Sequence, residues 1–182
     1  MEENPHLGGC FHPAFTETPD GERAVVAEHS DANKIFSAHD VIVGDGAFCP
    51  TASLFLKKTS LDKYTVDLLK VIPCGDYFTQ VLSACPHGLG YLNQVMSVYR
   101  INQANSFTSE FSSSNYEKKI EFYTRMRRSL LVLKNIVGSD YDQSFKIIDR
   151  KYKKILFKFK KRKLKEKLYR AFSFNKNSES IE

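Results

Sequence analysis

The sequence predicts a mixed α/β domain that ends in a basic helix, and three observations predict it. Short apolar runs bounded by Gly and Pro follow the order strand, strand, helix, strand, helix. At 182 residues with 42% hydrophobic side chains, the chain can bury one ordinary core. Twelve Lys or Arg residues and one acid, Glu166, lie between Arg150 and Arg170, whereas residues 1–149 carry a net charge of −4.

The N-terminal segment predicts two strands around a turn. Residues 9–12 and 24–26 form the strands, and Thr18-Pro19-Asp20-Gly21 forms the turn. Pro fixes the φ angle of one turn residue and Gly adopts the positive φ of another, so these residues favour a hairpin turn. A short amphipathic stretch over 29–40 and a glycine-bearing loop at 44–46 follow.

The middle of the chain alternates strand and helix. Small and apolar residues alternate over 48–56, which predicts a strand buried against the core, and residues 61–71 fit one or two helical turns. A helix over 77–85 has Phe78, Val81 and Leu82 on one face. Pro86-His87-Gly88 stops that helix, and two strands follow within residues 89–100.

The C-terminal third is predicted to be helical after a loop. Residues 102–115 are polar and rich in serine, which predicts a long loop, and loops of that length are often functional. A helix follows over 117–137. The last helix begins near Tyr141 and runs toward Phe172.

The sequence also limits the class of protein. Its longest apolar runs are too short for a transmembrane helix, and its polar start predicts no secretory signal, so we expect a cytoplasmic location. The cysteines form no Cys-x-x-Cys pair, and the histidines are scattered, so the sequence predicts no zinc site. Buried thiols in a reducing compartment are the simpler interpretation of Cys10, Cys49, Cys74 and Cys85.

Asp76 follows Gly75 at the start of the helix predicted over 77–85. From the residues alone, Asp is a favoured N-cap that satisfies free backbone N–H groups. A carboxylate at this helix end also stays ionised and keeps a fixed direction, as a general base requires. The residues alone leave both roles open.

An ordered series of motifs resembles the second half of the bacterial family 2 glycosyltransferase domain, which has the GT-A fold. The series is Pro50-Thr51-Ala52-Ser53-Leu54-Phe55-Leu56-Lys57, then Gly75-Asp76-Tyr77, Gly90-Tyr91-Leu92 and Val98-Tyr99-Arg100. The start, from Glu3-Asn4-Pro5 to Cys10-Phe11-His12, is also similar to the family. The resemblance covers roughly residues 3–107 and implies an incomplete GT-A-like, Rossmann-like mixed sheet with flanking helices.

The resemblance implies a sugar transferase, inverting at the anomeric carbon, in surface polysaccharide or glycolipid synthesis. Its donor would be a nucleotide sugar, and its acceptor a glycan or a lipid-linked sugar. It makes Asp76 the catalytic base rather than only a cap, and implies that Gly75, Tyr99, Arg100 and Asn102 bind substrate. Arg100 would offset charge on the leaving group, although a surface ion pair is an equally good interpretation. Many relatives have a histidine where this chain has Asn102, a poorer metal ligand.

The family's donor half is not matched. Family members hold a divalent metal, Mg or Mn, with an Asp-x-Asp motif. Here Asp140-Tyr141-Asp142 comes far too late, and Asp40 and Asp45 have the wrong spacing. We therefore expect residues 1–115 to be the acceptor-side half of the domain, in a truncated product, a split enzyme's second piece or a fragment. A missing N-terminal half would supply the metal ligands, and a non-catalytic remnant or partner subunit is the alternative.

The basic tail has two interpretations. Residues 116–172 form the expected helical extension, and 173–182 the expected disordered tail. Ile148, Tyr152, Ile155, Leu156 and Phe159 share one side of the helix, whereas Phe157, Leu164, Leu168 and Phe172 lie nearly opposite. Residues 148–170 could dock on the anionic inner face of a membrane, or the apolar stripe could pack on protein. Because the body is acidic and no nucleic-acid motif occurs, we expect no nucleic-acid partner.

Overall fold

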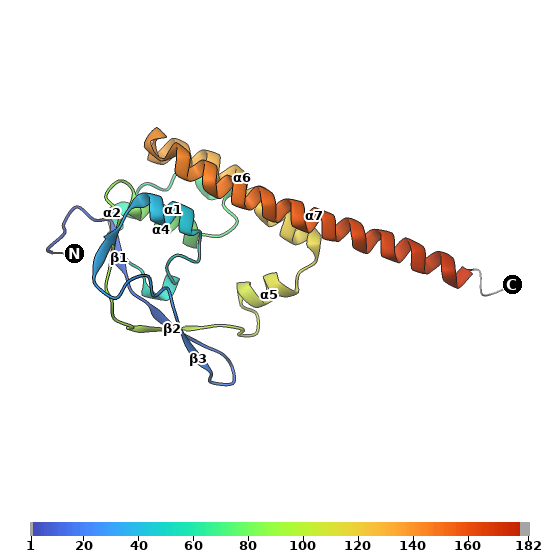
Figure 1. Cartoon of the computed structure of the whole chain (residues 1–182). Coiled ribbons are helices and arrows are strands. Elements are labelled where there is room, and N and C mark those ends of the chain that lie inside the picture. The colour runs from blue at the N-terminus through green and yellow to red at the C-terminus, as the bar shows by residue number, and fades with distance from the viewer. Residues whose placement is uncertain (1, 179–182) are drawn as a thin grey trace.

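The computed structural model describes residues 2–178, with side chains described for residues 2–169. This part of the chain has the predicted mixed α/β class, with two mixed β-sheets and seven α-helices (Figure 1). The predicted disordered tail, residues 173–182, lies outside the residues whose side chains are described.

Two small sheets form the β part of the fold. The first has four strands in the order β4-β6-β1-β5, namely Lys34–Phe36, Leu89–Tyr91, Gly9–Phe11 and Phe55–Leu56. The second has three strands in the order β3-β2-β7, namely Arg23–Val26, Ala14–Glu17 and Ser97–Arg100. Within these sheets β1 is parallel to β6 and β2 is parallel to β7, whereas the other neighbours are antiparallel.

The same two chain segments run through both sheets. β1 continues into β2 across His12 and Pro13, while β6 continues into β7 across the longer stretch 92–96. The Leu92 N–H donates to the Phe11 carbonyl at 2.9 Å, so the pairing persists where the ladder breaks. Because Pro13 has no N–H, it cannot extend the first ladder. The chain therefore bends here into a second sheet.

Three predictions of local structure are wrong in detail. The hairpin partner of β3 is β2, not residues 9–12, because the break at Pro13 places β1 in the other sheet. The strand predicted over 48–56 is reduced to β5, Phe55–Leu56, and a 3-10 turn, Thr51–Ser53, precedes it, since the N–H and hydroxyl of Ser53 both donate to the Pro50 carbonyl. The predicted loop 102–115 contains helix α5, Phe107–Ser113, capped by the Ser106 hydroxyl.

Helices of the body surround the first sheet. The amphipathic stretch 29–40 divides into β4 and the start of α1, Ala38–Gly44, which a Ser37–Asp40 capping box begins. Helix α3, Val66–Val71, lies within the helical turns predicted over 61–71, whereas α2, Lys58–Leu61, begins before them. Helix α4, Asp76–Ala84, matches its prediction, and its apolar face of Phe78, Val81 and Leu82 is fully buried.

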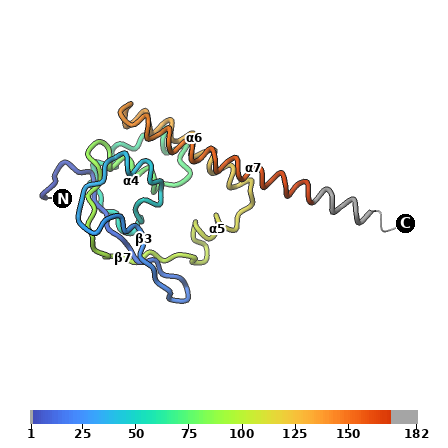
Figure 2. Tube along the Cα trace, in the orientation of Figure 1, coloured from blue at the N-terminus to red at the C-terminus, as the bar shows by residue number. Residues whose placement is uncertain are grey.

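The last two helices form an antiparallel pair that turns at Gly138 (Figure 2). They are α6, Tyr116–Val137, and α7, Asp142–Ser178. Three ion pairs set the register along their length: Lys134–Asp142 at 2.9 Å, Arg127–Asp149 at 2.6 Å and Lys163–Glu117 at 2.6 Å. Such exposed pairs add little stability, but they show that α7 passes the start of α6 near residue 163.

The helix pair shares one hydrophobic core with the body. Ile148, Tyr152 and Leu156 of α7 are at most 7% exposed, and α7 packs on both α6 and α1. The first apolar stripe of the tail therefore packs on protein, which was one of its two interpretations. From α6, Leu130 and Leu133 enter the same core.

Two leucines of α6 provide a matched test of this core. Leu133 is fully buried, whereas Leu131 is 67% exposed on the same helix. We expect Leu133→Ala to lower the free energy of unfolding by about 2–5 kcal/mol, because it removes packed atoms and leaves a cavity. Leu131→Ala should change it by about 0.5 kcal/mol or less. Urea unfolding of both variants checks this, and equal effects would contradict the shared core.

Candidate active-site cleft around Asp76

Asp76 is the first residue of α4, and the N-cap position is occupied by Gly75. Its side chain is exposed. Among the residues that the structure describes, no hydrogen bond or ion pair engages its carboxylate. Asp76 is therefore not the N-cap of α4, which was one of its two interpretations. The carboxylate is open to an incoming hydrogen-bond donor.

Asp76 borders two adjoining hollows, each of about 270 Å³. We call them the strand-side hollow and the helix-side hollow. The strand-side hollow is lined by β2, β3 and the loop after α1, including Thr16, Val26, Ala27, Cys49, Pro50 and Thr51. The helix-side hollow is lined by Asp45, Cys74, Tyr77, Phe107, Thr108, Phe122, Tyr123, Met126 and Tyr152. Gly46, Ala47, Asp76 and Tyr99 border both. Together they form one cleft.

Buried side chains hold the loop that lies between the two hollows, residues 45–50, in place. Gln80 of α4 is fully buried, and its amide donates to the carbonyls of Gly46 at 3.1 Å and Cys49 at 2.9 Å. The ring of His29 stacks on Phe48 with a centroid distance of 4.5 Å, and its Nε2 lies 2.6 Å from the Phe48 carbonyl. A buried side chain with two bonds to one loop fixes the position of that loop. The cleft wall is therefore preformed.

Asp45 joins this loop to α7. Its Oδ1 accepts from the Tyr152 hydroxyl and from the Gly46 N–H at 2.8 Å, and its Oδ2 lies 3.1 Å from the Lys151 ammonium. Its backbone φ of 67° is uncommon outside Gly and Asn. These partners hold the Asp45 carboxylate in place, so the two carboxylates of the helix-side hollow have different environments. Asp45 is fixed, whereas Asp76 is open.

The two thiols and several of the tyrosines that line the cleft have raised pKa values. Burial, and then the charge of Asp76, raise the pKa of Cys49 to about 12 and that of Cys74 to about 11. Burial first, and then the charge of Asp45, also raise the pKa of Tyr77 and of Tyr152. A thiolate or phenolate nucleophile is therefore disfavoured at neutral pH. The cleft therefore offers one open carboxylate, Asp76, beside two protonated thiols.

The structure brings only some of the predicted site residues together. Tyr99 of β7 faces the cleft beside Asp76. Arg100, the next residue, pairs with Glu17 at 3.6 Å, as β7 and β2 align them, and its side chain is 73% exposed. Successive strand residues point to opposite faces, so Arg100 is the surface ion pair that its second interpretation described. Asn102 is exposed just after β7, with a φ of 57°, and does not line either hollow.

Gly75 contributes backbone rather than a side-chain site. Its carbonyl accepts from the hydroxyls of Tyr64 at 3.2 Å and Thr79 at 3.0 Å. A Cβ added at this position would meet nothing within 4 Å. The position therefore does not require glycine for space, and the carbonyl is already occupied.

Sequence reasoning missed the far wall of the cleft. Tyr123 of α6 and Tyr152 of α7 lie with ring centroids 5.6 Å apart, and α5 adds Phe107, which is 55% exposed. The periodicity placed both tyrosines on apolar stripes, which predicts burial and not a cleft. Phe107 and Thr108 lay in the segment predicted to be a loop. Only a tertiary contact map could have grouped them with Asp76.

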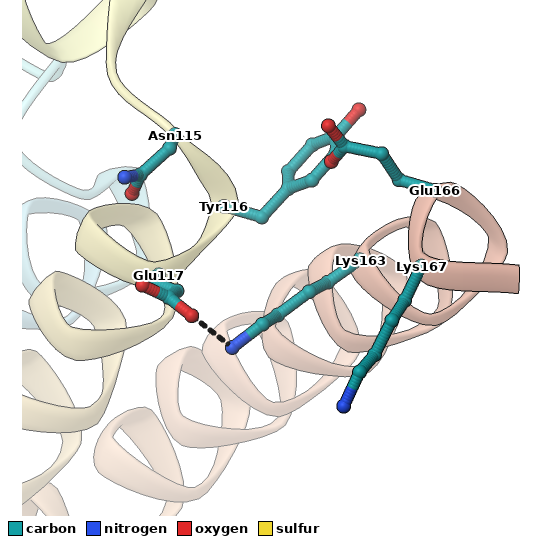
Figure 3. A pocket seen from close by; sticks show the side chains of 6 residues that line it. All are labelled: Asn115, Tyr116, Glu117, Lys163, Glu166 and Lys167. Carbon is teal, nitrogen blue, oxygen red and sulfur yellow. Dashed lines mark ion pairs between the residues drawn. The ribbon is translucent and has the colours of Figure 1, made fainter. Parts of the chain in front are cut away.

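A larger hollow of about 380 Å³ lies between the start of α6 and α7, away from Asp76. Figure 3 shows its lining side chains, with Glu117 and Lys163 joined by an ion pair of 2.6 Å. The side chains of Glu117 and Lys163 are 67% and 44% exposed. Because this hollow is lined by exposed charged side chains, we do not assign it a ligand.

The cleft does not fit the divalent metal that the resemblance implies. In the described part of the chain, no three His, Cys, Asp or Glu side chains come together as metal ligands. Asp45 is already bound by Lys151 and Tyr152, so Asp76 has no second free carboxylate beside it. Hard cations need several oxygen ligands. We derive no step through a metal held by these residues.

Comparisons with known protein families, with curated proteins and with solved structures returned no match for this chain. Among its described helices, none combines the length and apolar character that spanning a bilayer requires.

The pKa of Cys74 gives a test of the cleft's charge distribution. At pH 8, iodoacetamide should alkylate Cys74 on the order of a hundredfold more slowly than a free thiol, because its raised pKa leaves little thiolate. Asp76→Asn removes a charge that raises this pKa, so the variant should react several-fold faster. Mass spectrometry of the alkylated peptide measures the rate. Asp67→Asn, an exposed acid at the start of α3, is the control, and equal rates for both variants would contradict the arrangement.

Proposed function

We propose that this chain is the acceptor side of a family 2-like, GT-A-like glycosyltransferase in which Asp76 is the catalytic base. The observation that carries the proposal is the exposed, unpaired Asp76 carboxylate at a helix start, between two hollows and beside Tyr99. The motif series over residues 3–107 supports the same assignment.

In the proposed reaction, a carboxylate oxygen of Asp76 takes the proton of the acceptor hydroxyl. The acceptor oxygen attacks the anomeric carbon of the donor sugar, and the bond from that carbon to the nucleotide diphosphate breaks. The diphosphate leaves with the bonding electrons, and the anomeric configuration inverts. Because Cys49 and Cys74 stay protonated, Asp76 is the base that this cleft offers.

The helix-side hollow suits the acceptor. Tyr123, Tyr152 and Phe107 give it aromatic faces, and such rings present an apolar surface with a polar edge to a glycan or a lipid-linked sugar. Tyr99 would orient the substrate beside the base. Arg100 and Asn102 lie outside the hollows, so in this proposal they contact substrate only if a further segment completes the site there.

The donor side belongs, in this proposal, to a separate N-terminal half of the domain. That half would carry the Asp-x-Asp motif, the Mg or Mn ion and the nucleotide-sugar site. The alternative is a non-catalytic remnant or partner subunit that keeps only the acceptor side. Calorimetric titration of this chain with UDP-glucose and Mn²⁺ tests the remnant, because clear binding of the donor contradicts it.

A pair of aspartate variants tests the base. In the full-length or reassembled enzyme, we expect Asp76→Asn to lower sugar transfer by about 10²–10⁴-fold, because Asn cannot accept the acceptor's proton. Asp67→Asn, also exposed in a first helical turn, should leave transfer unchanged.

The measurement is transfer of radiolabelled sugar from UDP-glucose or UDP-galactose to bacterial polar lipids. Circular dichroism of each variant checks that the fold is kept. Full transfer by Asp76→Asn would contradict the assignment of the base. Absence of transfer by the unaltered protein even when it is combined with a donor-side half would favour the remnant.

A further inference from the structure

The second apolar stripe of α7 faces away from the rest of the protein. Phe157, Leu164 and Leu168 are 70%, 59% and 50% exposed. They lie seven and four residues apart, so at 3.6 residues per turn they share one helix face. The buried residues Ile148, Tyr152 and Leu156 occupy the other side. The helix therefore has one apolar face on the core and a second one in solvent.

Basic side chains flank this outer stripe on both sides. Lys153 and Lys160 lie along one edge, and Arg150, Lys154 and Lys161 along the other, all of them exposed. The single acid between residues 150 and 169, Glu166, lies on the opposite side of the helix. Lys163, which pairs with Glu117, is also off this face. The outer face is thus apolar at its centre and cationic at its rims.

No described element covers the outer stripe. Because α7 passes the start of α6 near residue 163, Leu164 and Leu168 lie on a part of the helix that runs beyond its partner (Figures 1 and 2). Phe157 faces outward where the two helices are still paired. The stripe is therefore accessible in the folded chain.

We propose that this outer face of α7 binds the surface of an anionic phospholipid bilayer. Phe157, Leu164 and Leu168 enter the boundary between headgroups and acyl chains, while the flanking lysines extend to lipid phosphates. An anionic leaflet attracts several such cations at once. Nucleic acid would also attract the lysines, but it offers no apolar phase for three aligned Phe and Leu side chains. The positive charge and the apolar stripe together therefore favour a membrane surface over nucleic acid as the partner.

The same helix relates the membrane to the candidate cleft. Tyr152 lines the helix-side hollow from the inner face of α7, about 8 Å along the axis from Phe157 and one helix diameter of about 10 Å across. A bilayer on the outer face would hold the cleft close to its headgroups. This placement suits a lipid-linked acceptor on the cytoplasmic face, but membrane binding itself stands independently of the proposed transferase.

Vesicle sedimentation of the full chain tests the proposal. We expect binding to equimolar phosphatidylglycerol and phosphatidylcholine vesicles, and at least about tenfold weaker binding to pure phosphatidylcholine. Rising salt should weaken the binding, because it screens the lysines. Replacing the apolar stripe by Phe157→Gln, Leu164→Gln and Leu168→Gln should reduce binding at least about tenfold while all the lysines remain.

A matched control uses apolar residues of similar exposure in the body. Phe55, Val66 and Leu69 are 64%, 67% and 56% exposed. Their replacement by Gln should leave vesicle binding unchanged, and circular dichroism checks that both triple variants stay helical. Equal binding by the stripe variant and the unaltered protein would overturn the proposal. Binding to RNA without binding to anionic vesicles would also overturn it. This test does not depend on the outcome of the Asp76 experiments.

Discussion

The carboxylate of Asp45 joins the two parts of this fold. It ends α1, turns the chain with a positive φ, and accepts hydrogen bonds from the Tyr152 hydroxyl and the Gly46 N–H beside the Lys151 ammonium. Two of these partners belong to α7, more than a hundred residues later. A half-buried carboxylate with three partners is costly to separate from them. The cleft loop and the helix therefore keep one relative position.

That constraint determines what the two faces of α7 do. With its inner face fixed on the core, Tyr152 completes the cleft beside Tyr123, and the loop that Gln80 holds forms the opposite wall. The outer face is then left with Phe157, Leu164 and Leu168 in solvent among cations. One helix thus both closes the candidate acceptor site and carries the proposed membrane surface. Neither role needs a movement of the helix.

The sequence predicted the elements whose signals are local. Helices α4 and α6 have clear apolar periods and end at Pro86 and Gly138, and both occur as predicted. The strand over 48–56 failed because a side-chain bond of Ser53 to Pro50 outweighed the apolar pattern. Asp76 was found through its motif, but Tyr123 and Tyr152 were not, since a cleft wall depends on contacts between distant segments. Strand alternation places the side chain of Arg100 on the other face of the sheet from Tyr99, where it forms the ion pair that was one of its two interpretations.

The central claim is that Asp45 and Tyr152 join α7 to the cleft, and a double-mutant cycle tests it most directly. Asp45→Gly removes the carboxylate and tolerates the positive φ, and Tyr152→Phe removes only the hydroxyl. Free energies of unfolding are measured for both single variants, the double variant and the unaltered chain. We predict a coupling free energy of about 1–3 kcal/mol, because each substitution removes the partner of the other. A coupling near zero would contradict the account.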